Sequence, residues 1–428
     1  MSMFDYDTRP ITPQVVLVGN RASSAGYTIR DFLSRNGVPY DWVDIEDVER
    51  LPAVISPSEM DPDRLPICIL PNGTRLAPAT VEDVAAGLGM VTAPALSEYD
   101  LIIAGAGPAG LAAAVYGASE GLHTLAVEAI APGGQAGTTS MIENYLGFPQ
   151  GISGSELATR ATAQARRFGA EILLARRLVD LSRDGPGYLA RLSDGTVVRA
   201  RATLLASGAD WRRLDIPGLD DLLGSGVYYG AGPSEAVTCT GCRVAVIGGG
   251  NSAGQAVVRF SRYAAHVTLL VRGNSLEASM SQYLIAQVDK LPNVEVRTNT
   301  EVVELEADQH LRALVVSSRT DSGRSRLPVD ALFVCIGGVP RTQGTAQVGI
   351  ALDKAGYIRT GRDVGTSPGA LEGWPLARHP LPLETSLPGL FACGDVRSGS
   401  IKRCAAAIGE GSMSVALVHQ RLAEVGGE

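Results

Sequence analysis

A buried strand that runs straight into a glycine-rich turn and then into a helix occurs twice in this chain. The two instances are LIIAGAGPAG at residues 101–110 and RVAVIGGGNSAG at residues 243–254. Glycines at these spacings allow a tight turn, let backbone N–H groups approach a pyrophosphate, and let the helix pack closely on the strand. The repeated pattern predicts an α/β fold with two Rossmann-like, doubly wound domains.

The first glycine turn is followed by an acid at the spacing of an adenosine dinucleotide site. The strand after the helix, HTLAVE, ends in Glu128, where a carboxylate can accept hydrogen bonds from both ribose hydroxyls. The alternative is a structural glycine turn with an incidental surface glutamate. The predicted cofactor contacts in this segment are Gly105, Gly107, Pro108, Ala109, Gly110 and Glu128.

The second glycine turn is followed by a cation instead. The strand HVTLLVR ends in Arg272, and a guanidinium there suits a 2′-phosphate, so NADPH is favoured over NADH. The alternative is an inherited fold whose nucleotide site is silent, with Arg272 a solvated charge. The predicted contacts are Gly248, Gly250, Asn251, Ser252, Ala253 and Arg272.

Composition argues against two classes of partner. A formal net charge of −8 without clustered Lys and Arg argues against a nucleic-acid surface. The uncharged stretch 101–118 approaches the length of a membrane span, but its glycines and proline belong to the nucleotide motif, so no membrane contact is expected. The N-terminus lacks a secretory pattern, and the chain is expected to be cytoplasmic. The cysteines are scattered apart from one C-x-x-C, so no metal site is predicted.

The first 92 residues follow a different pattern. Strands at 15–20 and 40–46 flank a helix around 27–36, and a strand at 65–70, a PNG turn and a helix near 81–88 come after them. This order looks like a thioredoxin or glutaredoxin fold, with Pro66 as its cis-proline. The redox pair of such a fold belongs at 21–24, where the sequence is Arg-Ala-Ser-Ser. Because no thiol stands there, the usual thiolate attack on a disulfide is not expected.

Several segments beyond the glycine turns resemble the thioredoxin reductases and related flavoenzymes. They are PGGQ at 132–135, IENYLGFP at 142–149, LLASGADWRRLDIPG at 204–218 and LETSLPGLFACGDVRSGSIKRCAAAIGEG at 383–411. The resemblance covers about three quarters of the chain and implies FAD in the first site. It implies that Asp395 bonds the ribityl chain and that a helix starting close to Ile401 aims its N-terminus at the flavin. The further FAD contacts it implies are Gly134, Gln135, Asn144, Gly208, Gly394, Asp395, Lys402, Arg403 and Ala405.

The resemblance also implies a division into domains. Residues 1–92 form the cysteine-free thioredoxin-like domain, 99–217 and 331–428 a discontinuous FAD-binding domain, and 218–330 an inserted NAD(P)-binding domain. Members of this family are usually homodimers through their FAD domains, so a homodimer is expected. The loop at 361–382 is long for its position, which suggests a cover over the site, a dimer contact or a passive surface loop.

The chain departs from the family at the redox-active cysteines. Thioredoxin reductases have a C-x-x-C about a dozen residues before the second glycine turn, and those positions here are Ala231 and Ser234. Another C-x-x-C, Cys239 to Cys242, stands nearer the turn and enters the strand. We interpret these two cysteines as structural, with a catalytic dithiol as the alternative.

Other residues near the flavin motifs are weak catalytic candidates. Tyr145, Tyr228 and Tyr229 are candidates for packing around the isoalloxazine, or are ordinary core rings. Lys402 and Arg403 are candidates for stabilising a reduced flavin, or are solvent-facing charges at a helix start.

The predicted function is that of an FAD-dependent oxidoreductase that oxidises NAD(P)H and passes electrons to an acceptor without the usual dithiol. The acceptor is expected to be a ferredoxin or flavodoxin, a quinone, dioxygen or a small molecule. One alternative is disulfide reduction through Cys239 and Cys242 or through thiols on a partner. Another is a flavin-binding sensor or docking protein.

Overall fold

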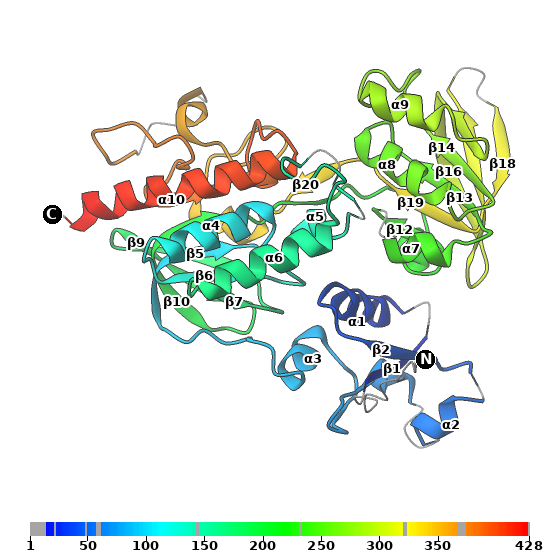
Figure 1. Ribbon diagram of the computed structural model, residues 1–428, viewed down its shortest axis with the longest axis horizontal. Helices are drawn as coiled ribbons and strands as arrows, with labels where there is room; N and C mark the ends of the chain where they lie inside the picture. Colours follow the sequence, from blue (N-terminus) through cyan, green and yellow to red (C-terminus); the bar gives the residue numbers. More distant parts are fainter. Residues whose placement is uncertain are drawn as a thin grey trace, which may run out of the picture. The chain divides into compact units, whose positions relative to one another are not determined.

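The computed structural model describes residues 14–20, 23–47, 49–56, 61–139, 141–142, 145–230, 233–319, 323–366 and 374–426 (Figure 1). The chain separates into two compact units, Met1–Met90 and Val91–Glu428. Each unit has its own β-structure and its own hydrophobic core.

The first unit contains one four-stranded sheet with helices. Its strands lie in the order β2-β1-β3-β4, with β2 parallel and β3 antiparallel to β1. The predicted succession, β-α-β and then β-β-α, is present, and the Leu65–Pro66 peptide is cis. The elements are β1 (Val15–Gly19), α1 (Ser24–Arg35), β2 (Tyr40–Asp44), α2 (Leu51–Val54), β3 (Ile67–Ile69), β4 (Arg75–Leu76) and α3 (Val81–Gly87).

Helix α1 shows why these residues fold locally as they do. The Ser23 hydroxyl accepts a hydrogen bond from the Gly26 amide at 3.2 Å, which caps the helix and satisfies one of its free donors. Ile29, Phe32 and Leu33 recur at helical spacing and are buried.

The second unit begins with a seven-stranded sheet. Its strands lie in the order β7-β6-β5-β10-β9-β8, and β21 pairs with β10. Strands β5, β6, β7, β10 and β21 run parallel, whereas β8 and β9 form an antiparallel hairpin. The strands are β5 (Glu98–Ala104), β6 (Thr124–Val127), β7 (Glu171–Leu173), β8 (Leu178–Asp184), β9 (Gly187–Leu192), β10 (Val197–Leu205) and β21 (Leu390–Ala392).

Four helices accompany this sheet, and helix α4 is in contact with β5, β6, α6 and α10 (Figure 1). Ten of the twelve residues of α4 are Ala, Gly, Leu, Val or Pro, and most of them are buried, as expected for a helix covered on several sides. The helices are α4 (Pro108–Ser119), α5 (Gly134–Gly137), α6 (Gly154–Arg167) and α10 (Cys404–Gly426).

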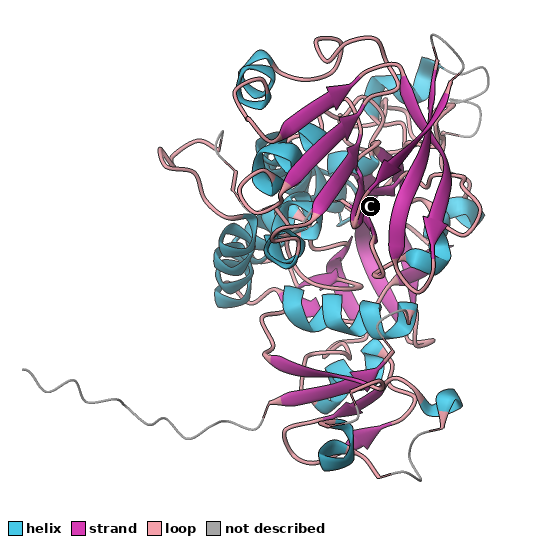
Figure 2. Cartoon of the chain, turned by 90° about the vertical axis from the view of Figure 1, so that its right-hand side faces the viewer, coloured by secondary structure: helices cyan, strands magenta, loops and turns pink. Residues whose placement is uncertain are grey.

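A five-stranded parallel sheet carries the second glycine turn. Its order is β12-β19-β13-β14-β15, and a separate antiparallel sheet contains β16, β17 and β18 (Figure 2). Phe260 and Phe333 pack at 4.1 Å between ring centroids in its core. The elements are β12 (Val227–Tyr229), α7 (Pro233–Thr238), β13 (Arg243–Ile247), α8 (Asn251–Phe260), β14 (His266–Leu270), α9 (Gln282–Val288), β15 (Val294–Arg297), β16 (Thr300–Ala307), β17 (Leu311–Ser318), β18 (Arg324–Pro328) and β19 (Ala331–Val334).

Two short strands lie where the chain leaves the seven-stranded sheet and where it returns from the five-stranded one. Strands β11 (Ala209–Trp211) and β20 (Gly338–Pro340) pair antiparallel. An inserted domain needs two such crossings. The exact domain boundaries stay a prediction.

Helix α10 begins later than the sequence pattern suggested. Its first helical bond runs from the Ala407 amide to the Arg403 carbonyl, so the helix starts at Cys404 and not close to Ile401. The Lys402 ammonium instead reaches back to the Asp395 carbonyl at 3.3 Å, and 401–403 stay outside the helix. No helix of the described segments is long and apolar enough to cross a membrane.

Candidate functional site

Glycine is sterically required at two positions of the first turn. Gly105 has φ +103°, and a Cβ there would lie 2.5 Å from the Ala206 carbonyl oxygen. A Cβ on Gly110 would lie 1.8 Å from the Gly105 carbonyl oxygen. Because no side chain fits at either glycine, backbone packs directly on backbone here, and α4 begins at the end of β5.

Gly107 differs from its neighbours because the space beside it is open. A Cβ there would meet only the Gly134 Cα, at 3.8 Å. Gly107 is the N-cap of α4, and Pro108 and Ala109 follow it in the first turn. The first amides of a helix have no partner within the helix, so this position fits a cradle for phosphate oxygens.

The Glu128 carboxylate lies directly beside this turn. Its side chain accepts hydrogen bonds from the Ala106 amide at 2.8 Å and from the Ile130 amide at 2.9 Å, one on each oxygen. The residue is only 7% exposed, so it is not an incidental surface charge. Each oxygen retains a lone pair that fits a ribose hydroxyl.

The PGGQ segment packs on the first turn. The Gly133 amide donates to the Ala106 carbonyl at 2.7 Å, and a Cβ on Gly134 would lie 3.0 Å from the Gly107 Cα. Gln135 is exposed in the following helix α5. The predicted contact Asn144 lies outside the described residues.

The C-terminal motif reaches the same place from the far end of the sequence. A Cβ on Gly411 would lie 2.1 Å from the Ala109 carbonyl oxygen, so α10 crosses α4 through a glycine. A Cβ on Gly394, which has φ +70°, would lie 3.0 Å from the Ala109 Cβ. The predicted FAD contacts at 105–110 and at 394–395 are therefore neighbours.

Asp395 is a half-buried acid at this junction. Burial raises the pKa of its carboxyl, and the positive charge of Lys402 only partly offsets this. No hydrogen bond to its carboxylate is formed within the part of the chain that the structure describes. A hydroxyl donor such as the ribityl chain fits this carboxylate, and the first amides of α10, including that of Ala405, follow nearby in sequence.

Gly208 lies at the start of the crossing strands. It has φ +71°, has open space at its Cβ position, and its carbonyl accepts a hydrogen bond from the Arg341 amide at 3.0 Å. This places it at the end of β10, beside the return strand.

The weak catalytic candidates separate in the structure. The Lys402 ammonium lies 4.2 Å from the centroid of the Tyr357 ring, whereas Arg403 is exposed. Burial raises the pKa of Tyr145, and the nearby Cys404 thiol contributes. These residues gather at the start of α10.

Tyr228 and Tyr229 do not gather there. Tyr228 stacks on Phe333 with centroids 4.9 Å apart, inside the core of the five-stranded sheet. The Tyr229 hydroxyl accepts a hydrogen bond from the Leu214 amide at 2.8 Å. These contacts match the alternative that the two rings are ordinary core residues of the domain that contains β12.

The second glycine turn is closed by a segment that the sequence reading missed. Gly248 has φ +145°, and a Cβ there would lie 2.3 Å from the Cys335 carbonyl oxygen. The Ser279 hydroxyl donates to the Gly249 carbonyl at 2.8 Å, and the Ser281 amide donates to the Asn251 side chain at 2.7 Å. These hydrogen bonds join residues 30 positions apart in the sequence, so no local pattern indicated them.

The other residues predicted to contact the nicotinamide nucleotide lie just beyond the ends of two parallel strands, β13 and β14. Gly250 is the N-cap of α8, with Ser252 and the buried Ala253 in its first turn. Arg272 lies just beyond β14 and is exposed, with no ion pair to another described residue. A solvent-facing cation at this edge fits a 2′-phosphate.

Cys239 and Cys242 lie at the opposite edge of that sheet. Cys242 comes one residue before β13 begins, whereas the glycine turn follows its end, five strand residues later. The Cys242 amide donates to the Cys239 carbonyl at 3.0 Å, and Cys239 is buried in the core. Burial raises the pKa of the Cys242 thiol, which disfavours the thiolate.

Sequence comparison places residues 99–411 in one family model, described as pyridine nucleotide-disulphide oxidoreductase. A thioredoxin reductase of Listeria innocua is 34% identical over 74% of this chain and 91% of its own length. That of Bacillus subtilis is 32% identical over 76% and 96%.

Solved structures give the same picture. The thioredoxin reductase of T. acidophilum is 26% identical with a TM-score of 0.67, and it matches 76% of this chain and 99% of its own. The enzyme of Lactococcus lactis is 25% identical with a TM-score of 0.68, over 76% and 99%.

Proposed function

Because this chain belongs to the pyridine nucleotide-disulphide oxidoreductase family, we propose that it is a thioredoxin reductase-type enzyme that reduces a disulfide on a partner. The chain is an FAD-dependent NAD(P)H oxidoreductase, and its cofactors are FAD and NADPH. We choose a disulfide as the acceptor because the relatives of this chain are named thioredoxin reductases. The overall reaction is NADPH, a proton and a disulfide giving NADP⁺ and two thiols.

The residues around the first turn are suited to hold FAD. Gly107 leaves room for the pyrophosphate, Glu128 offers two oxygens to the ribose, and Asp395 offers a carboxylate that accepts no hydrogen bond from the described residues. When bound, FAD supplies the chemistry by accepting a hydride from the nicotinamide and releasing its electrons to an acceptor.

The residues around the second turn are suited to hold NADPH. Gly248 to Ala253 present the start of α8 to the pyrophosphate, and Arg272 offers a guanidinium to the 2′-phosphate. NADPH is therefore proposed as the better substrate of the two nicotinamides.

The route by which electrons leave is the point at which the chain departs from its relatives. Ala231 and Ser234, at the usual cysteine positions, cannot form thiolates. Cys239 and Cys242 lie at the edge of the sheet away from the glycine turn, with the Cys242 thiol disfavoured as a thiolate. We therefore favour a route in which the disulfide of the partner itself reaches the flavin side.

A second candidate function follows from the same observation. Without sulfur at 231 and 234, reduced FAD can also serve an acceptor that is not a disulfide, such as a ferredoxin or flavodoxin, a quinone, dioxygen or a small molecule. A third candidate, a flavin-binding sensor, predicts no turnover with any acceptor.

We propose that the first unit is a thioredoxin-like or glutaredoxin-like domain with a docking or regulatory role. Its elements follow the succession β-α-β and then β-β-α along the chain, and residues 21–24 contain no cysteine. The family model begins at residue 99, so this proposal rests on the succession of elements alone. A homodimer and a redox protein as partner are proposed from the relatives.

The test is steady-state NADPH oxidation by the FAD-loaded full chain. The acceptors are oxidised thioredoxin and an aromatic disulfide, compared with a quinone, ferredoxin and oxygen. The Cys239→Ser/Cys242→Ser double variant is predicted to keep its disulfide reductase rate within about twofold, as is the control Thr240→Ala in the same turn.

The outcomes separate the candidates. Loss of disulfide reduction in the double variant alone would place the dithiol at Cys239 and Cys242. Turnover with a quinone or oxygen but with neither disulfide would replace the proposal by the second candidate.

A further inference from the structure

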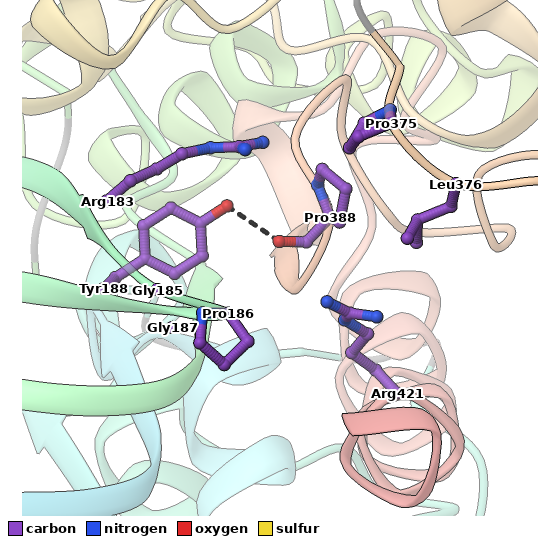
Figure 3. A pocket seen from close by; sticks show the side chains of 9 residues that line it. All are labelled: Arg183, Gly185, Pro186, Gly187, Tyr188, Pro375, Leu376, Pro388 and Arg421. Carbon is purple, nitrogen blue, oxygen red and sulfur yellow. Dashed lines mark hydrogen bonds between the residues drawn. The ribbon is translucent and has the colours of Figure 1, made fainter. Parts of the chain in front are cut away.

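A cavity of about 170 Å³ lies in the second unit, apart from both glycine turns (Figure 3). It is partly open to solvent and is bordered by the β8–β9 hairpin, the segment before β21, residues 375–376 and α10. Its lining includes Arg183, Pro186, Tyr188, Leu376, Pro388 and Arg421.

Two arginines from different elements line this cavity. Arg183 comes from the end of β8 and Arg421 from the last turns of α10 (Figure 3). Arg421 is 8% exposed, and its Nε has no hydrogen-bond partner in the described structure. Because that Nε has almost no accessible surface, a ligand in the cavity would contact the terminal amino groups of Arg421 instead.

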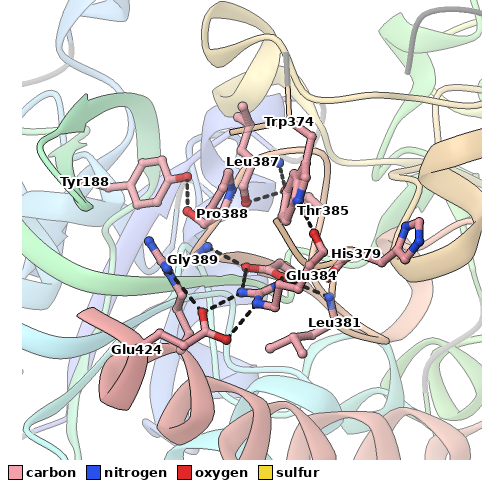
Figure 4. A network of polar contacts seen from close by, with 12 residues as sticks. Tyr188, Trp374, His379, Leu381, Glu384, Thr385, Leu387, Pro388, Gly389 and Glu424 are labelled. Atoms are coloured by element: carbon pink, nitrogen blue, oxygen red, sulfur yellow. Dashed lines mark hydrogen bonds and ion pairs between the residues drawn. The ribbon is translucent and has the colours of Figure 1, made fainter. Parts of the chain in front are cut away.

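The charged side chains next to the cavity neutralise one another without a contribution from Arg183. Arg378 donates to Glu384 at 2.6 Å and to Glu424 at 2.7 Å, and Arg421 donates to Glu424 at 3.2 Å. Glu384 is fully buried and also accepts the Leu381 and Gly389 amides (Figure 4). Two arginines and two glutamates therefore form a neutral network.

Arg183 is exposed and adds a further positive charge beside this network. It forms no ion pair with any described residue, and the adjacent Asp184 is already paired with Arg199 at 2.9 Å. An anion in the cavity would supply the missing negative charge, and guanidinium groups bind carboxylate and phosphate oxygens in a planar, two-pronged geometry.

The rest of the lining is apolar or neutral. Pro186, Leu376 and Pro388 contribute carbon surface. The Tyr188 hydroxyl donates to the Pro388 carbonyl at 2.8 Å, and burial raises its pKa, so it stays neutral. Mixed apolar walls with a few convergent polar groups are typical of small-molecule sites.

We propose that this cavity binds a small organic anion, with its carboxylate or phosphate group between Arg183 and Arg421 and its carbon part against Leu376 and the prolines. The site is separate from the proposed electron transfer. Arg421 lies 17 residues after Cys404, which along a helix is about 25 Å. The inference does not depend on which acceptor the enzyme uses.

The test is isothermal titration of the FAD-loaded full chain at constant ionic strength. The probes are glycerol 3-phosphate and butyrate, with glycerol as the uncharged control. The variants are Arg183→Gln and, as a matched control, Arg177→Gln, an exposed arginine of the same unit just before β8. Thermal unfolding of each variant verifies that the fold is kept.

Saturable binding of either anion that weakens about tenfold in Arg183→Gln, and is unchanged in Arg177→Gln, is the expected result. Tighter binding of glycerol 3-phosphate than of butyrate would identify a phosphate ligand, and the reverse a carboxylate. No saturable heat with either probe, or equal binding by Arg183→Gln and the parent, would overturn the proposal.

Discussion

The amide of Ala106 donates to the carboxylate of Glu128 at 2.8 Å, and this bond ties the glycine turn after β5 to the end of β6. The same carboxylate also accepts the Ile130 amide, and it is the proposed contact of the adenosine ribose of FAD.

Replacing Glu128 by Gln removes the charge but keeps one acceptor for these amides. FAD binding is expected to weaken about tenfold, because a charged acceptor for two hydroxyls becomes a neutral one. Equilibrium dialysis of the apoprotein against FAD measures it. The exposed Glu98→Gln on β5 is the control, and equal affinities in the two variants would argue against the ribose contact.

Gly107 and Gly110 are predicted to respond differently to alanine. Gly107→Ala adds a methyl group to open space, so the free energy of unfolding of the apoprotein should change by less than about 1 kcal/mol while FAD affinity falls. Gly110→Ala places a methyl group 1.8 Å from the Gly105 oxygen, and it should destabilise the apoprotein by about 1–3 kcal/mol or more.

Urea unfolding of both apoproteins and their FAD affinities separate the two effects. If Gly107→Ala bound FAD as tightly as the parent, the open space beside Gly107 would not be the pyrophosphate cradle.

Asp395 is predicted to lower the stability of the apoprotein in a pH-dependent way while it strengthens the binding of FAD. Its pKa is raised in the folded chain by burial, so between the ordinary aspartate pKa and this raised pKa the folded state holds more protons than the unfolded state, and stability falls as pH rises through that range. Asp395→Asn should therefore raise the thermal midpoint of the apoprotein at neutral pH, and the gain should vanish in acid where both states are protonated.

The same variant should bind FAD less tightly, because the amide replaces the charged acceptor. The acid-to-neutral comparison by calorimetry checks the sign. A variant that is less stable than the parent at neutral pH would contradict this reading of Asp395.

Arg272 is predicted to set the choice of nicotinamide. Arg272→Gln should raise the KM for NADPH about tenfold and leave that for NADH unchanged, since only NADPH carries the 2′-phosphate. Arg262→Gln, another exposed arginine of the same domain, is the control. A parallel rise for both nucleotides would indicate a general loss of binding.

The two nucleotide-binding turns were predictable from the sequence because steric contacts with nearby backbone require glycine at fixed positions. A Cβ at Gly105 or Gly110 collides with backbone a few residues away or in an adjacent strand, so the spacing itself carries the geometry. The meeting of 394–395 with 105–110 was predictable only through resemblance to a family, since nothing local links segments so far apart.

Other parts of the site were not predictable from the sequence. The closure of the second turn by Ser279 and Ser281 depends on side-chain bonds across about thirty residues. Tyr228 and Tyr229 were candidates for packing around a flavin, but the direction of β12 decides where such rings point. The balance of charge around Arg378 likewise appears only once loop and helix are folded together.

Anaerobic titration of the FAD-loaded chain with NADPH tests the central claim most directly. The account predicts that NADPH bleaches the long-wavelength flavin absorbance stoichiometrically, more readily than NADH, and that oxidised thioredoxin then restores it. A colourless protein that does not take up added FAD, or a bound flavin that neither nicotinamide reduces, would contradict it.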